Sequence, residues 1–425
     1  MTAPPPARRG PTLYDDLAAG LLWPRLLRAA SLAARPQRIL LALFLVLLLG
    51  ALGSVRMPWA EEGSLPFLQA VAGDKLRSLH LIWLGLTSVE PGVMLSGFAH
   101  LTTDVTRLML PQYPVSTFLI GIPALLIIAV LGGAICRSVA TEFSQEIVHP
   151  WPRVLRFAVE RWLTFIGSLA LPWIAVALAG LVLAVSGWIF FGGLPVLDVL
   201  GAILFGLALL LGLAAVLLVG LSVFAGPLLL PAAACEGSDA IDAAQRAFAY
   251  ACARPLRLLW YFLVAAVVGL LAVGVVYLLA EGADRFARSA AASWASPSGT
   301  AALTGEFPAE ASLDAAGNPR ELRGTSAAAA RAVDLWSSAL GALVAAYALS
   351  YVFVAGTLVY LFIREVCDGQ HHTELWTPGL IESSLEASMR RPADAPPVQP
   401  LPDEGDDIEP QEESKKAPLP QMNAD

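Results

Sequence analysis

One group of residues near the C-terminus has the types and spacing that a metal site would need. Cys367 is followed closely by Asp368, His371 and His372, and thiolate, carboxylate and imidazole groups are all zinc ligands. A structural zinc site normally draws on a second ligand pair, and no second Cys pair accompanies this group. An ordinary segment beside a membrane explains these residues more simply, so we expect no bound metal.

The remaining acidic and histidine residues do not form a pattern typical of an active site. Glu142 and Glu146 lie one helical turn apart, but no His follows at metal-site spacing, which indicates a solvated helix face. An enzymatic role would need four residues before position 114 to meet at one membrane surface: His80, Glu90, His100 and Asp104. No phosphate-binding loop, dinucleotide fingerprint or nucleophile elbow is present. We therefore predict no catalytic residues, no cofactor and no enzymatic activity.

The most distinctive polar pattern lies between residues 231 and 257. Its charged and aromatic residues recur in steps of three or four, which places them on one face of a helix. They are Asp239, Asp242, Arg246, Tyr250 and Arg254. Ser238 is the predicted N-cap, and Pro255 ends or redirects the helix. The spacing predicts an ion pair between Asp242 and Arg246, and stacking of Tyr250 on one of the two arginines.

This face is a candidate interaction site. Exposed ion pairs contribute only about 0.2–1 kcal/mol each, so pairs on a solvated helix stabilise a fold very little. Either the face packs on the other cytoplasmic loops, or it docks a protein partner. The pattern itself is compatible with both interpretations.

The elements that would position this face are membrane helices. Hydrophobic residues make up 56% and charged residues 15% of the chain, which is typical of a polytopic membrane protein. A helix needs about 20 apolar residues to cross a hydrocarbon core of about 30 Å. Six runs of that order occur, at about 39–55, 115–136, 163–190, 199–225, 258–280 and 336–363. We predict an all-α polytopic bundle of six transmembrane helices within residues 39–363.

Basic residues in the connecting segments predict the sidedness. Arginines cluster before residue 39 and in the segments after the second and fourth helices, and such loops stay in the cytoplasm. Both termini are therefore predicted to be cytoplasmic, and residues 56–114 and 281–335 form the outer loops. Arg38 and Arg56 flank the first helix and are expected to reach the two interfaces. The four cysteines lie at or near the cytoplasmic side, where we expect free thiols.

The chain outside the membrane region divides into three parts. Within the cytoplasmic segment 1–38, leucines at helical spacing and several arginines predict an amphipathic helix at 12–34 that lies in the headgroup layer. A helix packed on the cytoplasmic loops is the alternative. Residues 364–384 form a segment beside the membrane, and the acidic, Pro-rich tail at 385–425 is predicted to be disordered. No basic cluster with interleaved aromatics occurs, so we expect no nucleic-acid partner.

Three motifs in the chain are similar to those of a known family. The central motif is Asp239-x-x-Asp242-Ala243-x-x-Arg246-x-x-x-Tyr250-x-x-x-Arg254-Pro255-Leu256; the others are Gly133-Ala134-Ile135-x-Arg137 with Arg161-Trp162-Leu163, and Tyr360-Leu361 with Arg364 and Asp368-Gly369. They resemble a family of uncharacterised bacterial six-span integral inner-membrane proteins, from about residue 20 to residue 376 without the outer loops. Related sequences usually carry Ser where this chain has Gln245. The resemblance implies an integral membrane protein and brings no assigned activity.

Two functional hypotheses follow from these patterns. The first is a non-enzymatic structural or interaction component of the bacterial inner membrane, with the lipid bilayer around it and a possible protein partner at the cytoplasmic segments 137–162, 231–257 and 364–384. The second is a transporter or permease-like subunit for an apolar or zwitterionic solute. It is favoured by kinked, Gly-rich helices and by Asp242-Ala243-Ala244, which is similar to the start of the coupling helix of binding-protein-dependent permeases; Phe248 stands where that helix has glycine.

Overall fold

The computed structural model describes residues 23–56, 66–104, 113–192, 195–307, 322–371 and 373–376, and in this part of the chain every regular element is a helix. Six helices are long and apolar enough to cross a membrane. They are α3 (Pro36–Gly53), α8 (Ile122–Gln145) together with the π-helical turn η3 (Thr117–Gly121), α10 (Trp162–Phe190), α11 (Pro195–Glu236), α13 (Pro255–Ala292) and α15 (Thr325–Asp368). The predicted all-α architecture with six such helices is confirmed, and the chain is a multi-pass membrane protein.

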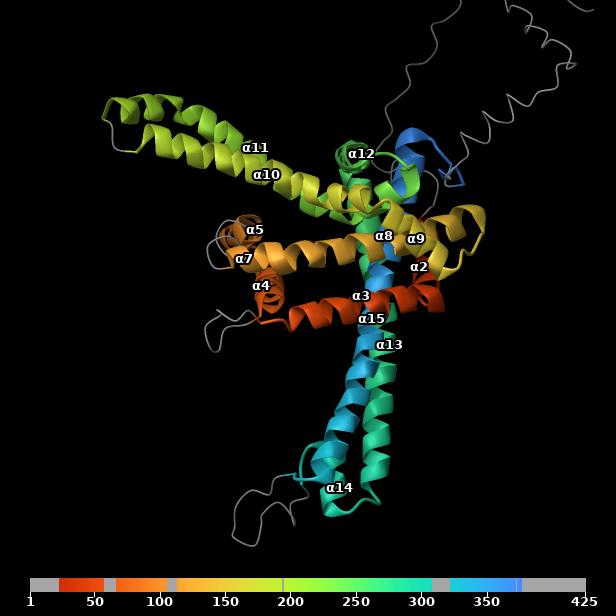
Figure 1. Cartoon of the computed structure of the whole chain (residues 1–425). Coiled ribbons are helices and arrows are strands. Elements are labelled where there is room, and N and C mark those ends of the chain that lie inside the picture. Colours follow the sequence, from red (N-terminus) through yellow and green to blue (C-terminus); the bar gives the residue numbers. More distant parts are fainter. Residues whose placement is uncertain are drawn as a thin grey trace, which may run out of the picture. The chain divides into compact units, whose positions relative to one another are not determined.

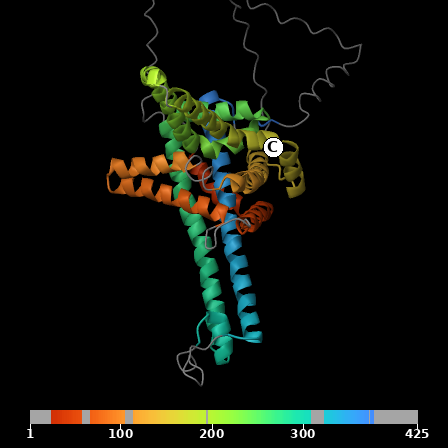
Figure 2. The ribbon, with the colours of Figure 1, turned by 60° about the vertical axis from the view of Figure 1, so that its left-hand side comes forward.

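Several of these helices extend well beyond the apolar runs that predict them. α11 has 42 residues and α15 has 44, which corresponds to about 63 and 66 Å at 1.5 Å per residue. Hydropathy marks only the part of a helix that suits a hydrocarbon core, whereas good helix formers such as the alanines at 327–330 continue α15 beyond its apolar run. Figures 1 and 2 show α13 and α15 side by side along most of their length.

The remaining helices connect and cover these six. They are η1 (Trp23–Leu27), α2 (Arg28–Ala33), α4 (Phe67–Thr87), α5 (Pro91–Asp104), α7 (Pro114–Ser116), α9 (Trp151–Glu160), α12 (Ala240–Ala253) and α14 (Pro297–Thr304). Most of the predicted N-terminal interfacial helix, residues 12–22, lies outside the described residues. Its described end packs on α15, where Tyr347 donates to the carbonyl of Ala30 and Ser350 to that of Ala33.

Buried side chains concentrate where four helices meet. Almost every residue is buried in 131–144 of α8, 228–236 of α11 and 354–364 of α15, and α12 packs its alanines against them. We call these three segments together with α12 the hub. In contrast, the most apolar stretches of α10, α11 and α13 have only 11%, 6% and 11% of their residues buried. Such long apolar surfaces suit contact with lipid.

The ends of α13 and α15 that lie away from the hub are joined through α14. Arg288 of α13 bonds to Asp284 through Nε at 2.9 Å, to the carbonyl of Leu303 at 2.7 Å and to the hydroxyl of Ser337 at 2.6 Å. Ser337 donates to Asp284 at 2.6 Å in turn. We call these residues the distal network.

Candidate functional site

The predicted polar face of α12 is divided between two environments. Asp239 and Asp242 are exposed, and Asp239 rather than Ser238 is the N-cap of the helix. Arg246 is 43% exposed and bonds to Glu236 at 2.9 Å, instead of the predicted Asp242. Tyr250 is buried against Tyr360, with ring centroids 5.8 Å apart, and donates its hydroxyl proton to Asp368. Arg254 is the C-cap, and its amide donates to the carbonyl of Tyr250. Tyr250 and the guanidinium of Arg246 therefore turn inward to the hub.

Glu236 at the end of α11 is the centre of this inward contact. Its carboxylate is 8% exposed, and three groups from two other helices bind it. These are the Tyr360 hydroxyl at 2.7 Å, Arg364 Nε at 3.2 Å and Arg246 Nη1 at 2.9 Å. Attraction to two guanidinium groups offsets the cost of burying the carboxylate. This arrangement ties α12 and α15 to the end of α11.

Burial, and then the hydrogen bond to Asp368, raise the pKa of the Tyr250 phenol well above its usual value. The neutral hydroxyl is the form that can donate to the carboxylate, so the contact depends on a protonated tyrosine. Asp368 itself lies at the last residue of α15, directly before the left-handed Gly369. The bond joins two segments that are 118 residues apart in the sequence.

Arg364 also fixes the segment that follows α15. Its Nε donates to the Gln370 side chain at 2.8 Å and its Nη2 to the carbonyl of Glu374 at 2.8 Å. These bonds hold Gln370 and Glu374 against the hub.

Two further arginines bind the carbonyl end of α11. Arg137 donates to the carbonyls of Ala234 and Trp376, both at 2.9 Å. Arg161 donates to those of Gly237 and Ser238 at 2.7 and 2.8 Å. The last carbonyls of a helix lack partners within it and form its negative end, so guanidinium groups suit this position.

Trp376 lies between these two arginines. Its ring centroid is 4.9 Å from the guanidinium carbon of Arg161 and 6.0 Å from that of Arg137. Gly237 has φ of +64°, and a Cβ there would meet the Trp376 ring at 2.0 Å. Glycine is thus required at position 237 both for its backbone conformation and for the close approach of the indole.

A second buried pair joins the N-terminal region to α8, and it corrects two predictions. Arg38 was expected at the interface, but its side chain is fully buried and bonds to the Leu32 carbonyl, to Ser138 and to Glu142. Glu142 was expected on a solvated face, yet it is 8% exposed and also pairs with Arg35 at 3.0 Å. Both predictions treated each helix alone, whereas the partners are 104 residues apart.

The hub brings together the three segments expected to share one side of the membrane, as far as residue 376. The residues that carry most of these contacts were not among the predicted site residues: Glu236, Tyr360, Arg364, Arg137, Arg161 and Trp376. Four of them, Tyr360, Arg364, Arg137 and Arg161, belong to the motifs that carry the family resemblance. The sequence signal that could have identified the charged members of this group was a charged residue next to the end of a long apolar run.

The other candidate groups are not assembled into a site within the described residues. No three His, Cys, Asp or Glu residues there are placed to hold a metal ion; His372 lies outside that part of the chain. His80 is exposed on α4, and His100 is exposed on α5. Glu90 is exposed in the link between these two helices. The side chain of Asp104 is not described. Cys136, Cys235 and Cys252 form no disulfide bond. A comparison with known protein families, with curated proteins and with solved structures finds no match for this chain.

Proposed function

We propose that this chain is a non-enzymatic interaction component of a bacterial inner membrane, with both termini and the hub in the cytoplasm. The observation that supports this proposal is the division of α12. Its inner face is fixed by Ala243, Ala244, Ala247 and Tyr250, all buried. Its outer face carries Asp239, Ile241, Asp242, Gln245 and Ala249, all exposed. A helix anchored this firmly offers an ordered surface at little entropic cost on binding.

The hub chemistry also favours binding over catalysis. Glu236, Arg364 and Arg137, and Arg38 of α3 beside them, direct most of their polar atoms to contacts with their own chain, which leaves few of these atoms for a reaction. The two carboxylates on the outer face of α12 match a partner with a basic surface, because complementary charge raises the association rate and selects the partner.

Crosslinking and affinity purification from native membranes test the proposal. The variant Asp242→Lys reverses a charge on the outer face of α12, and Asp334→Lys makes the same change at a side chain that is 72% exposed near the distal network. We expect proteins that co-purify with the wild type and with Asp334→Lys but not with Asp242→Lys. The same set of proteins with all three chains would contradict docking at α12. Arg246→Glu is a less suitable variant because it also breaks the bond to Glu236.

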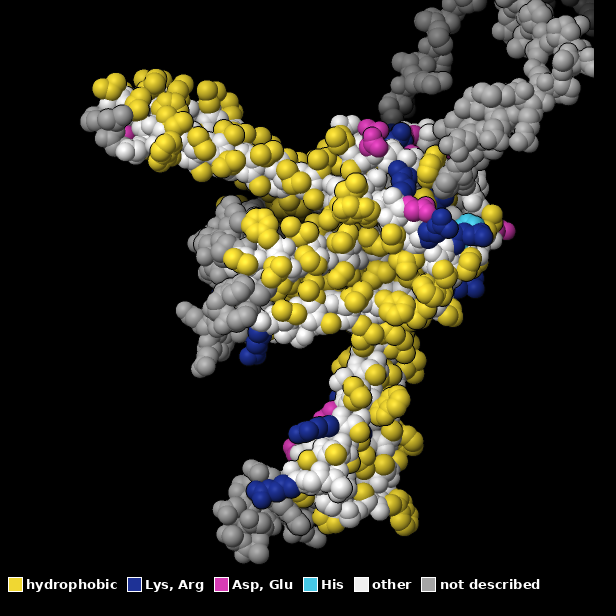
Figure 3. All heavy atoms as spheres, viewed as in Figure 1, with side chains coloured by type: hydrophobic (Ala, Val, Ile, Leu, Met, Phe, Trp, Pro, Cys, Tyr) yellow, Lys and Arg dark blue, Asp and Glu magenta, His cyan; other side chains and the backbone are white. Residues whose placement is uncertain are grey.

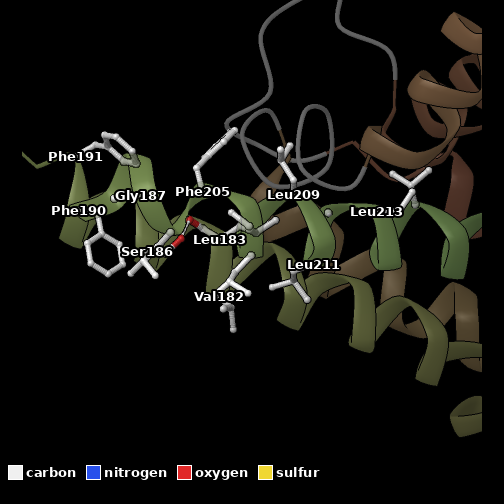
Figure 4. A pocket seen from close by; sticks show the side chains of 16 residues that line it. Val182, Leu183, Ser186, Gly187, Phe190, Phe191, Phe205, Leu209, Leu211 and Leu213 are labelled. Carbon is white, nitrogen blue, oxygen red and sulfur yellow. Dashed lines mark hydrogen bonds between the residues drawn. The ribbon is translucent and has the colours of Figure 1, made fainter. Parts of the chain in front are cut away.

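A permease-like role for an apolar solute is the second candidate, and one observation favours it. A groove of about 750 Å³ lies between α10 and α11, lined by residues such as Val182, Phe190, Phe205 and Leu213 (Figure 4). Its one side chain with a polar group, Ser186, donates to the carbonyl of Leu183 in its own helix. The lining therefore suits hydrocarbon and not a zwitterion. Uptake of an apolar fluorescent probe into vesicles should fall when Gly212→Trp fills the groove; unchanged uptake would remove this candidate.

A further inference from the structure

The segment that joins α8 to α10 presents apolar and basic side chains together on its outer surface. The exposed apolar residues are Ile147, Val148, Trp151, Val159 and Trp162, each between 38% and 53% exposed. Arg153 and Arg156 of α9 are exposed beside them and lie three residues apart, so they share one face of that helix. Figure 3 shows basic side chains over α9 bordering hydrophobic ones. We call residues 147–162 the α9 surface.

The inner side of α9 is fixed, so this surface has a defined orientation. Val154 and Ala158 are buried, and Phe157 packs against the Arg137 guanidinium with 4.7 Å between Arg137 Cζ and the ring centroid. Trp151 contacts Phe44 of α3, with ring centroids 6.4 Å apart. Val154, Phe157 and Ala158 are directed inward, so Arg153 and Arg156 remain on the opposite side, while Trp151 touches Phe44 at the edge of the surface and stays 38% exposed.

The charge around the α9 surface is positive. Residues 35–38 and 137–162 contain six arginines and three glutamates. Glu142 pairs with Arg35 and Arg38, Glu160 pairs with Arg156 at 2.7 Å, and Glu146 is exposed at the end of α8. Burial, and then the charges of Arg153 and Arg137, lower the pKa of His149, which keeps this residue from adding to the positive charge at neutral pH. Arg38 and Arg137 are buried, so the exposed charges are those of Arg35, Arg153 and Arg156 against Glu146 and Glu160, which leaves a net charge of about +1 at neutral pH.

Tryptophans place the α9 surface at the level of lipid headgroups. Trp162 begins α10 and Trp188 lies 26 residues later, near its other end. This separation is about 39 Å along a helix, close to the distance between the two interfaces of a bilayer. Trp side chains are enriched at both interfaces. α9 directly precedes Trp162 and therefore lies next to one of them.

We propose that the α9 surface binds anionic phospholipids. Arg153 and Arg156 contact the headgroup phosphates, while Ile147, Val148, Trp151 and Trp162 insert among the upper acyl chains. An amphipathic helix with arginines on one side and Trp and aliphatic residues beside them suits an anionic membrane surface. The proposal depends on neither the protein partner at α12 nor the side of the membrane on which the hub lies.

Lipid binding in bilayers of defined composition tests this inference. Wild-type chain is placed in nanodiscs of phosphatidylcholine with one third phosphatidylglycerol, and the lipids retained after release are counted by native mass spectrometry. Each basic residue near an anionic surface contributes about 1 kcal/mol, which is about fivefold in affinity. We therefore expect enrichment of phosphatidylglycerol on the wild type and a loss of about 25-fold in affinity in Arg153→Gln/Arg156→Gln.

Arg285 of α13, close to the distal network, offers a matched control. Arg285 is 77% exposed and pairs with Glu281 at i,i+4 spacing, as Arg156 does with Glu160. Arg285→Gln should retain the wild-type enrichment, and Arg153→Lys/Arg156→Lys should keep most of it because the charge remains. Three outcomes would overturn the proposal: equal retention of both lipids by the wild type, an unchanged preference in the double Gln variant, or an equal loss in Arg285→Gln.

Discussion

The hub and the distal network use the same kinds of bonds with different consequences. Each contains arginines that bind a carboxylate and a backbone carbonyl, and a hydroxyl that donates to the same carboxylate. In the hub, Glu236 and Arg364 are 8% and 6% exposed, whereas Asp284 and Arg288 are 28% and 24% exposed. Water screens the second pair and hardly reaches the first. Because burial strengthens an ion pair and makes its loss costly, we expect the hub to contribute more to the stability of the fold than the distal network.

Removal of the central carboxylate of each network should produce the largest difference between the two in free energy of unfolding. Glu236→Ala leaves the buried Arg364 guanidinium without its anion, and breaking a buried pair costs about 3–5 kcal/mol. The equivalent Asp284→Ala should cost only about 1 kcal/mol, because its partner can be hydrated. Unfolding in mixed micelles with increasing denaturing detergent measures both values. Similar losses at the two sites would break the comparison.

Two glycines in the same backbone conformation test the packing around each region. Gly237 has φ of +64° and faces the Trp376 ring, whereas Gly305 has φ of +85° and open space where a Cβ would stand, with no neighbouring atom within 4 Å. Gly305→Ala should cost about 1 kcal/mol from backbone strain alone. Gly237→Ala adds a steric clash and should cost about 2–4 kcal/mol.

A double-mutant cycle separates strain from clash at position 237. If the indole causes the extra loss, Gly237→Ala in a Trp376→Ala background should cost no more than Gly305→Ala. An undiminished cost in that background would show that Trp376 is not the neighbour that matters.

Arginine-to-lysine changes test the geometry of the bonds while keeping the charge. Arg137→Lys cannot reach the carbonyls of Ala234 and Trp376 together, so about 2 kcal/mol should be lost. Arg288→Lys in the distal network should lose about 1 kcal/mol. Hydrogen exchange of residues 373–376 should accelerate in Arg137→Lys and stay unchanged in Arg288→Lys. Unchanged protection of this segment in both variants would show that Arg137 does not hold it.

The pH dependence of the free energy of unfolding should report the hydrogen bond from Tyr250 to Asp368. This is the smallest of the expected effects. Its pKa is raised in the folded state, so the stabilisation is complete below the unfolded pKa of about 10 and is lost as the pH rises above it. Tyr250→Phe should cost about 1 kcal/mol below pH 10 and should flatten the decline above it. Identical slopes for wild type and Tyr250→Phe would contradict this assignment.

The sequence predicts the membrane helices better than the contacts between them. Six apolar runs are enough to find α3, α8, α10, α11, α13 and α15, because hydrocarbon thickness sets a minimum length. The ends were underestimated, since Thr325–Leu335 and Glu281–Ala292 are helical without being apolar throughout. Local spacing identified α12 as a helix, but Tyr250 of the predicted polar face is buried.

The partners of that face could not be predicted from spacing. A period of three or four residues relates side chains within one helix, so it suggested Asp242 for Arg246. The real contacts join positions far apart in the sequence, such as Tyr250 with Asp368 and Arg38 with Glu142. A single sequence does not show which distant positions come into contact. A charged residue therefore cannot be predicted to be buried before its partner of opposite charge is known.

The segment at 369–376 has a consequence for biosynthesis. Membrane helices enter the bilayer in the order of translation, whereas Arg137 and Arg364 acquire the carbonyls of Trp376 and Glu374 only near the end of the chain. A product that stops within α15 leaves the hub open and its guanidinium groups short of acceptors. An opened region is the part of a protein that cellular proteases recognise. Closure of the hub therefore has to wait until the residues up to Trp376 have been synthesised, and an open hub is more accessible to proteolysis until then.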